Sequence, residues 1–555
     1  MNISTHEQAL ARAGTRKIGG SYYTPSEVVN RLLDLALDPI LQRHQGDLQR
    51  LTELRVLDPA CGSGNFLVAV GSRIQAALED AGAPAQEAAS IAFGDCLAGI
   101  DLDPVAVVLC VDAIVDASGS SCIRDAVGAR VLDGDALALV SGHGQLFGDS
   151  QWENLLALTG ATDGFDLVIG NPPFLSQLST ETVRSPAYTE RLRHLFGSAV
   201  GGLTDTAVLF LLLATSLARS PGGVVSLIQP ISVLSAKQAR EARTAVLRAS
   251  GMETAWICEE EIFDASVRVF APVLVRGEQP HEVRLLRGRS FEVAGAIPAD
   301  DLEGPTWSSL LAAAKGVPDS HMETNGVLRD LATVTADFRD QFYGLRGCVI
   351  DLEIGDDAVL PPLVTSGLVD PAHLLWGVRS AKFDKTSYRY PRVDLGRLSV
   401  EMEQWAHQRM VPKVLLATQT RVLEAAVDAT GRFLPSVPLL SITSAKSEEL
   451  WKIGALLSSP PITALAARRH LGAALGSDAL KLSASAVMDL PLPAHEDCWD
   501  QAADLFRSSS EASVEDLRMR LLDEVGVLMC RAFGCESEEL LEWWRGRLPM
   551  RGGDT

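Results

Sequence analysis

The sequence lacks the cysteine patterns of disulfide frameworks and zinc sites. Its nine cysteines form no CxxC pair and no Cys/His cluster at metal-ligand spacing. The closest two, Cys530 and Cys535, are predicted to be buried thiols on a helix. The pattern excludes a small disulfide-stapled secreted fold and favours a reducing compartment, with no metal site expected.

The sequence also lacks a membrane-spanning segment. No apolar run reaches the roughly 18 residues needed to cross a bilayer. The longest, Ala207 to Ala218, is interrupted by Thr215 and Ser216 and is predicted to be a buried helix. Because the N-terminus has no apolar stretch typical of a signal peptide, we expect a cytoplasmic protein that makes no membrane contact.

The sequence also lacks an excess of positive charge, which argues against general nucleic-acid binding. The 555 residues carry a formal net charge of −22. Residues 361–490 differ, with 15 Lys and Arg against 11 Asp and Glu. A basic segment therefore lies inside an acidic protein. Hydrophobic residues make up 47% and charged residues 22%, as in globular proteins, and the length predicts at least two domains.

The first 280 or so residues alternate short apolar runs with longer amphipathic stretches. This pattern predicts a doubly wound, Rossmann-like α/β fold with a mostly parallel sheet. Helices are expected at 65–81 and 104–115. The expected strands are 55–58, 97–101, 130–132, 165–170 and 224–229.

The remainder of the chain follows other patterns. We expect a connecting region over 286–340, after a first domain of residues 1–285. Residues 341–495 contain short β-type runs with many Pro and Gly residues, which predicts a mixed α/β or β-rich domain. Residues 496–555 have helical periodicity and are predicted to form a helical tail.

A glycine loop follows the first expected strand. Asp58-Pro59-Ala60-Cys61-Gly62-Ser63-Gly64 leads from that strand into a helix, so the backbone can approach a ligand closely. Alone, the loop also fits an ordinary turn. The second strand ends at Asp101, where a carboxylate can bind ribose hydroxyls. A dinucleotide site is disfavoured, because the third glycine is missing and Asp101 lies 37 residues after Gly64.

A second loop, Asn171-Pro172-Pro173-Phe174, follows another apolar strand. Two prolines remove backbone donors and stiffen the loop, leaving carbonyl oxygens to accept hydrogen bonds. The Asn171 side-chain oxygen and a neighbouring carbonyl offer two acceptors to one amino group, and Phe174 can stack on a planar base. A rigid turn without function is the alternative for the tetrapeptide alone.

Taken in order, these motifs resemble the S-adenosylmethionine-dependent adenine-N6 DNA methyltransferases of the gamma class, over most of residues 15–280. Gly20 to Pro25 looks like the N-terminal motif of that family, and Asp58 to Phe66 looks like its main cofactor loop. Asn171 to Phe174 matches its catalytic motif, and Phe263 falls where a second aromatic contacts the target base. The resemblance implies cofactor binding by Tyr23, Thr24, Pro25, Asp58, Ala60, Gly62, Gly64, Asp101, Leu102, Asp135 and Asn171, and catalysis by Asn171, Pro172, Pro173, Phe174 and Phe263.

The resemblance also implies a mechanism, a DNA partner and a biological setting. A methyl group would pass from the cofactor to N6 of an adenine flipped out of double-stranded DNA. Residues 341–495 resemble a target-recognition domain, so DNA contacts are expected from Arg379, Lys382, Lys385 and Arg389. The setting is expected to be a bacterial restriction-modification or phage-defence system. Only about 19 residues precede Gly20, so any nuclease is expected on a separate restriction or defence protein.

Three alternatives remain open from the sequence. The acceptor could be a glutamine amide or an RNA base, because an amide nitrogen needs the same help from paired acceptors. The chain could be a modification subunit that needs a separate specificity protein, with residues 341–495 as its docking surface. It could also be a non-catalytic sensor that retains the fold, although the intact Asn171 to Phe174 motif argues against that.

Overall fold

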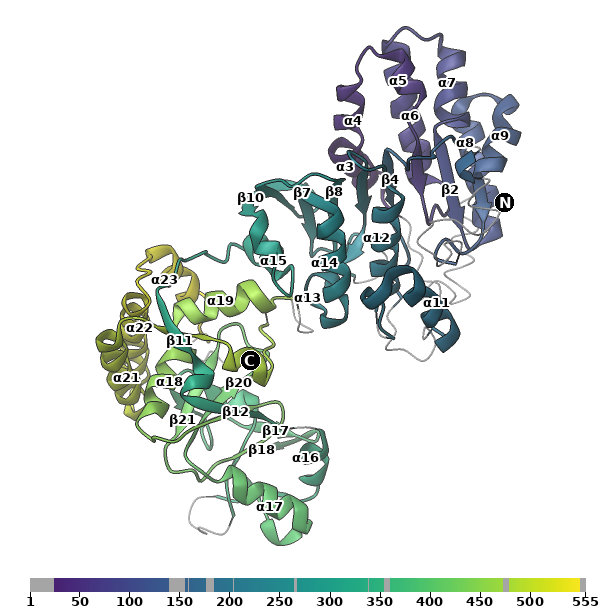
Figure 1. Ribbon diagram of the computed structural model, residues 1–555. Helices are drawn as coiled ribbons and strands as arrows, with labels where there is room; N and C mark the ends of the chain where they lie inside the picture. Colours follow the sequence, from purple (N-terminus) through teal and green to yellow (C-terminus); the bar gives the residue numbers. More distant parts are fainter. Residues whose placement is uncertain are drawn as a thin grey trace. The chain divides into compact units, whose positions relative to one another are not determined.

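The computed structural model describes residues 24–138, 155–157, 159–175, 184–202, 204–263, 267–337, 339–353, 360–472 and 479–549. The chain divides into two compact units, Met1–Ala314 and Lys315–Thr555 (Figure 1). Tyr23 and the rest of the predicted N-terminal motif before Thr24 lie outside the described residues.

The first unit contains a sheet whose strand order is β10-β9-β7-β8-β5-β4-β1-β2-β3, with β6 paired to β8. Its parallel part runs outward through β1, β2 and β3, and the chain then returns to place β4 and β5 on the other side of β1. This reversal between β1 and β4 confirms the predicted doubly wound fold. The five strands are β1 (Val56–Asp58), β2 (Leu97–Asp101), β3 (Val131–Asp133), β4 (Leu167–Gly170) and β5 (Val224–Leu227).

Antiparallel strands extend this sheet beyond β5. They continue to residue 298, into the stretch predicted as a connecting region. The sequence signal is weak there because β10 is an edge strand with mostly exposed side chains. Trp256 stacks on Phe291 with ring centroids 4.3 Å apart, which holds the β9–β10 hairpin against β7. The strands are β6 (Gln229–Pro230), β7 (Ser250–Cys258), β8 (Val269–Arg276), β9 (Glu282–Arg287) and β10 (Glu292–Pro298).

Helices cover the parallel strands on both faces. Alternate strand residues such as Leu167 and Ile169 join one apolar cluster with helices α3, α6, α7, α8 and α9. Val168 points to the opposite face, where α12 contacts β4 and β5. The helices of this unit are α3 (Ser26–Ala36), α4 (Asp38–Arg43), α5 (Leu48–Thr52), α6 (Asn65–Asp80), α7 (Ala85–Gly94), α8 (Pro104–Ser118), α9 (Arg124–Arg130), α11 (Pro186–Phe196), α12 (Thr206–Leu217), α13 (Ser232–Ser235), α14 (Arg240–Ala249) and α15 (Ser308–Ala314).

The second unit combines a four-stranded antiparallel sheet, in the order β12-β23-β20-β21, with several two-stranded pairs. Its strands are β11 (Thr324–Val327), β12 (Ala332–Ala336), β13 (Val349–Asp351), β14 (Leu363–Val364), β15 (Val369–Asp370), β16 (His373–Leu374), β17 (Ala381–Phe383), β18 (Thr386–Tyr388), β19 (Pro391–Val393), β20 (Lys413–Ala417), β21 (Glu424–Asp428), β22 (Leu434–Pro435), β23 (Leu440–Ser444) and β24 (Pro491–Pro493).

The helical tail packs with helices from earlier in the second unit, because α18 contacts α21 and α19 contacts both α22 and α23. The helices of this unit are α16 (Arg339–Gly344), α17 (Val400–Arg409), α18 (Glu449–Leu457), α19 (Pro460–His470), α20 (Ala484–Met488), α21 (Glu496–Glu511), α22 (Glu515–Ala532) and α23 (Glu538–Arg545). Within the described ranges, no helix of either unit is long and apolar enough to cross a membrane.

Candidate active site

The glycine loop lies at the end of β1, beside the point where the strand order reverses. Its backbone is tied to the second strand, because Cys61 N donates to the Ile100 carbonyl at 2.9 Å. Gly64 ends the loop as the N-cap of α6 with φ +91°, and a Cβ there would lie 2.9 Å from Cys110 Sγ. A side chain at position 64 is therefore excluded twice, by backbone conformation and by space.

Asp101 joins the glycine loop to the end of β2. Its Oδ2 accepts a hydrogen bond from Gly62 N at 2.8 Å, and its Oδ1 accepts one from Asp103 N at 2.9 Å. Burial raises the pKa of this carboxyl above its usual range, while hydrogen bonds from backbone N–H groups, those of Asp103 and Gly62 among them, lower it. A carboxylate offers about four lone-pair sites, so the group can still accept from a ribose hydroxyl.

Leu102, directly after Asp101, is 75% exposed although it is a large apolar residue. A planar adenine lying against it would bury this surface next to a group suited to ribose. Asp101 and Leu102 thus offer a hydrogen-bonding carboxylate directly beside an exposed apolar side chain, a chemistry suited to a nucleoside.

Asp58 and Gly170 bring the ends of β1 and β4 into contact. Asp58 is only 1% exposed, and its Oδ1 accepts from Ala60 N at 3.0 Å. A Cβ at position 170 would lie 2.3 Å from that same oxygen, so the close approach requires glycine. Burial raises the pKa of Asp58 to about 8. Gly170 was not among the predicted site residues, although it stands directly before Asn171.

Asn171 contacts the N-terminal motif across 147 residues of sequence. Its Nδ2 donates to Thr24 Oγ1 at 3.0 Å, and Thr24 is 4% exposed just before α3. Pro25 is the N-cap of α3, and its carbonyl accepts from Val29 N at 3.1 Å, which fixes the segment that carries Thr24. The structure thus brings together two predicted motifs whose order alone was evident from the sequence.

The two predicted aromatic residues border the same apolar core. Phe174 is partly buried against the cluster around β1 and β4, whereas Phe263 is a member of that cluster and only 7% exposed. Pro172 is buried and Pro173 half-buried, so packing of these two prolines fixes the loop that carries Phe174. Phe174 has the more accessible ring of the pair.

Asp135 lies after β3 and is engaged on both oxygens. Oδ1 accepts from Leu137 N at 3.0 Å, and Oδ2 accepts from the Tyr188 hydroxyl at 2.6 Å. Tyr188 belongs to α11, the first described helix after the loop 171–174. No sequence signal pointed to it, because it belongs to none of the recognised motifs.

In the second unit, the predicted DNA-contacting residues lie around the β17–β18 hairpin. Lys382 and Lys385 are exposed, and residues 384 and 385 form its tight turn with positive φ angles of 44° and 68°. Phe383 anchors the hairpin in an apolar cluster. Arg379 instead bonds the Gly367 carbonyl at 3.1 Å and lies 3.5 Å from Asp370.

Much of the positive charge in this basic segment serves the fold itself. Lys413 is fully buried and pairs with Asp428 at 2.7 Å. Arg392 donates to the Leu360 carbonyl at 2.8 Å and lies 4.9 Å from the Trp376 ring. Arg389 is exposed, although its backbone N–H donates to Asp351 at 3.0 Å. All four predicted residues are thus exposed, and Arg379 differs from the other three in its ion pair with Asp370.

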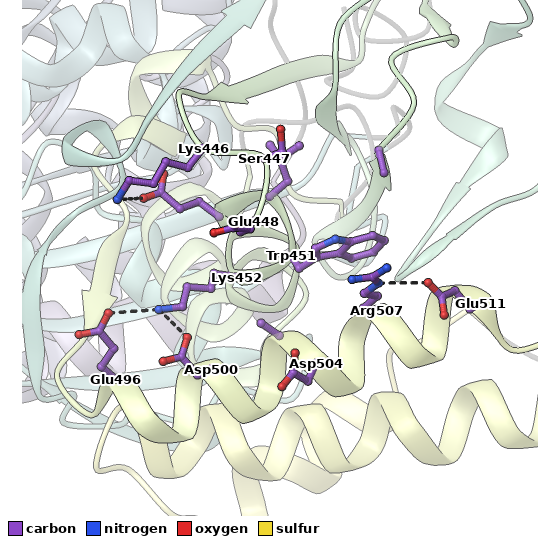
Figure 2. Close-up of a pocket in the computed structure, with 14 residues that line it drawn as sticks. Lys446, Ser447, Glu448, Trp451, Lys452, Glu496, Asp500, Asp504, Arg507 and Glu511 are labelled. Atoms are coloured by element: carbon purple, nitrogen blue, oxygen red, sulfur yellow. Dashed lines mark hydrogen bonds and ion pairs between the residues drawn. The ribbon is translucent and has the colours of Figure 1, made fainter.

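A groove of about 840 Å³ lies in the second unit between α18 and α21 (Figure 2). Its cations are paired within it: Lys446 with Glu449, Lys452 with Glu496 and Asp500, and Arg507 with Glu511. None of the predicted site residues lines this groove. Among the residues that the structure describes, no group of three or more His, Cys, Asp or Glu side chains could hold a metal ion.

Comparison with known proteins finds similarity in both sequence and fold. Residues 140–263, which include the loop 171–174, match the family model described as Eco57I restriction-modification methylase. Comparison with curated proteins finds no match. The type IIL restriction-modification enzyme MmeI, solved in complex with DNA, has a similar fold, with a TM-score of 0.60 at 14% identity over 96% of this chain and 79% of MmeI.

A second solved structure is also similar in fold. A nuclease-deletion mutant of the type ISP restriction-modification enzyme LlaGI, bound to a DNA substrate mimic, gives a TM-score of 0.50 at 13% identity over 88% of this chain and 47% of that one. The family-model match covers residues 140–263 of the chain, and the two solved structures show that its fold is similar to that of restriction-modification enzymes.

Proposed function

We propose that this protein is a site-specific DNA methyltransferase that transfers a methyl group from S-adenosylmethionine to N6 of a flipped-out adenine. The observation that carries the proposal is the meeting of three motifs at the reversal between β1 and β4. The glycine loop ends β1, the loop 171–174, which we call the catalytic loop, ends β4, and Thr24 orients the Asn171 amide between them. In doubly wound sheets this crevice is where nucleotides bind.

The Asn171 amide has a defined role in this reaction. Because Nδ2 donates to Thr24, the amide presents Oδ1 as the acceptor for an amino proton. The Pro172 carbonyl would accept the second amino proton. Together they localise the N6 lone pair, which is otherwise delocalised into the ring and is a poor nucleophile. Placement of both reactants in line and fixed dipoles supply the rest of the rate.

The bound cofactor supplies an electrophilic methyl group on a sulfonium sulfur. Asp101 would hold its ribose, Leu102 and Asp135 its adenine, and Thr24 with Pro25 its methionine end. Phe174 would stack on the flipped adenine, an interaction worth about 1–3 kcal/mol. That gain helps to offset the few kcal/mol needed to take a base out of the duplex.

The second unit would recognise the DNA, and the β17–β18 hairpin would make its main DNA contacts. A two-stranded β-ribbon fits the major groove of B-DNA. Lys382 faces Ser387 directly across the hairpin, and both side chains are exposed. Lys385 at the turn is suited to a phosphate contact. The net charge of −22 opposes binding to random DNA, which leaves affinity to this local surface.

Methyl transfer to unmethylated bacterial DNA, with labelled S-adenosylmethionine and the purified full chain, tests the proposal. The Asn171→Ala variant should lose transfer while cofactor affinity stays within a few fold. Asn325→Ala, an exposed amide on β11, is the matched control and should methylate normally. Full activity in Asn171→Ala would refute the mechanism.

Two other outcomes would redirect the functional proposal. Cofactor binding without transfer would identify a modification subunit that needs a separate specificity or defence protein. Transfer to protein or RNA but not to DNA would identify a different acceptor. The bacterial restriction-modification or phage-defence setting is part of the proposal, with DNA and a restriction or defence protein as partners.

A further inference from the structure

A hydrogen bond links the helix after the catalytic loop to the loop after β3. The Tyr188 hydroxyl donates to Asp135 Oδ2 at 2.6 Å across 53 residues of sequence. The position of Tyr188 is set locally, because its backbone N–H donates to Oγ of Ser185, the N-cap of α11, at 3.2 Å. Arg191, one turn further along α11, donates to the Ala138 carbonyl. Helix α11 therefore forms two hydrogen bonds to the loop after β3.

The Asp135 carboxylate is fixed from two sides. Leu137 N occupies one lone pair of Oδ1, and the Tyr188 hydroxyl occupies one lone pair of Oδ2. Rotation of the carboxylate would break both bonds, so its remaining lone pairs point in defined directions. Burial and the contact with Asp135 raise the pKa of the Tyr188 phenol, which therefore keeps its proton and remains a donor.

We propose that Tyr188 is a positioning residue for the cofactor, holding the Asp135 carboxylate in the orientation that accepts the exocyclic amino group of the cofactor's adenine. This inference rests on the proposed function, because it requires S-adenosylmethionine to occupy the site. Tyr188 acts through Asp135 and does not itself contact the reacting atoms. Its hydroxyl thereby connects recognition of the adenine to the helix that follows the catalytic loop.

Binding of two cofactor-like ligands to the full chain tests the inference. The first is S-adenosylhomocysteine, and the second is its purine-riboside analogue, in which hydrogen replaces the 6-amino group. Calorimetry gives both dissociation constants, and their ratio measures how strongly the site prefers the amino group. Wild-type protein should prefer the amino ligand, and Tyr188→Phe should reduce that preference about 3- to 10-fold, chiefly by weakening the amino ligand.

Two controls separate positioning from support of the fold. Tyr343→Phe removes the hydroxyl of an exposed tyrosine on α16 and should leave both affinities unchanged. In an Asp135→Ala background, Tyr188→Phe should cause no further loss of preference, since a double-mutant cycle reports the coupling of the two residues.

Each other outcome overturns the inference in a recognisable way. An unchanged preference in Tyr188→Phe would show that the hydroxyl does not orient Asp135. An equal loss of affinity for both ligands would show that Tyr188 only supports α11. If wild-type protein binds neither ligand, the proposed cofactor itself is wrong, and the proposed role of Tyr188 is then wrong as well.

Discussion

Replacement of Thr24 by valine tests how the catalytic amide is oriented. Valine matches threonine in shape but cannot accept the hydrogen bond that Asn171 Nδ2 donates at 3.0 Å. Thr24 is 4% exposed, so water cannot easily replace the missing acceptor. The amide would then lose one interaction that favours its observed orientation, and Oδ1 would face the target amino group less often.

The expected size of the effect follows from the cost of removing a hydrogen bond. Removing this acceptor from the half-buried Asn171 amide costs about 1–2 kcal/mol, and if the cost falls on the transition state the rate drops roughly 5- to 30-fold. Because Thr24 is also expected near the methionine end of the cofactor, the rate should be measured in a single turnover at saturating cofactor and DNA.

Thr24→Ser is the matched variant, since it restores the hydroxyl while removing only a methyl group. It should recover most of the wild-type single-turnover rate. The account of Asn171 would be refuted if Thr24→Val reacts as fast as wild-type protein. It would equally be refuted if the serine and valine variants are slowed by the same factor.

Three further predictions concern stability and DNA binding. Gly170→Ala places a Cβ 2.3 Å from Asp58 Oδ1 and should lower the free energy of unfolding, measured by denaturant titration, by about 1–3 kcal/mol. Gly128→Ala, in open space on α9, should not lower it, and equal effects of the two substitutions would contradict the close approach of Gly170 to Asp58. Asp58 has a folded-state pKa near 8 against an ordinary 3.8. Its contribution to the free energy of unfolding is therefore full below about pH 4 and is lost as pH rises toward 8. Asp58→Asn should therefore gain stability relative to wild type between pH 5 and 8, by at most about 1.4 kcal/mol per pH unit, and parallel stability curves would refute the raised pKa of Asp58. Lys382→Ala with Lys385→Ala should weaken DNA binding and reduce the slope of log affinity against log salt by about 1 for each phosphate that is no longer neutralised, and an unchanged slope would place DNA elsewhere.

The parallel part of the fold was predictable because its signals are local. Buried strands such as Leu97–Asp101 are short apolar runs, and the glycine loop and the catalytic loop mark where two of them end. Their position in order along the chain is enough to indicate a doubly wound sheet. The β9–β10 hairpin was missed because an exposed edge strand has little apolar periodicity.

The interactions within the site were less predictable, since they join residues far apart in sequence. Nothing local to Thr24 indicates that it meets Asn171, and nothing local to Tyr188 indicates that it meets Asp135. The count of Lys and Arg in residues 361–490 was misleading for another reason, because a basic residue need not be at the surface. Lys413 contributes to the basic count of its segment, yet it is buried in an ion pair with Asp428.

The most direct test of the central claim is the chemical identity of the methylated product. Unmethylated DNA treated with the purified chain and S-adenosylmethionine is digested to nucleosides and analysed by mass spectrometry. The account predicts N6-methyladenine as the product, absent when Asn171→Ala replaces the wild-type protein. A methyl group on cytosine, or N6-methyladenine formed equally by Asn171→Ala, would contradict it.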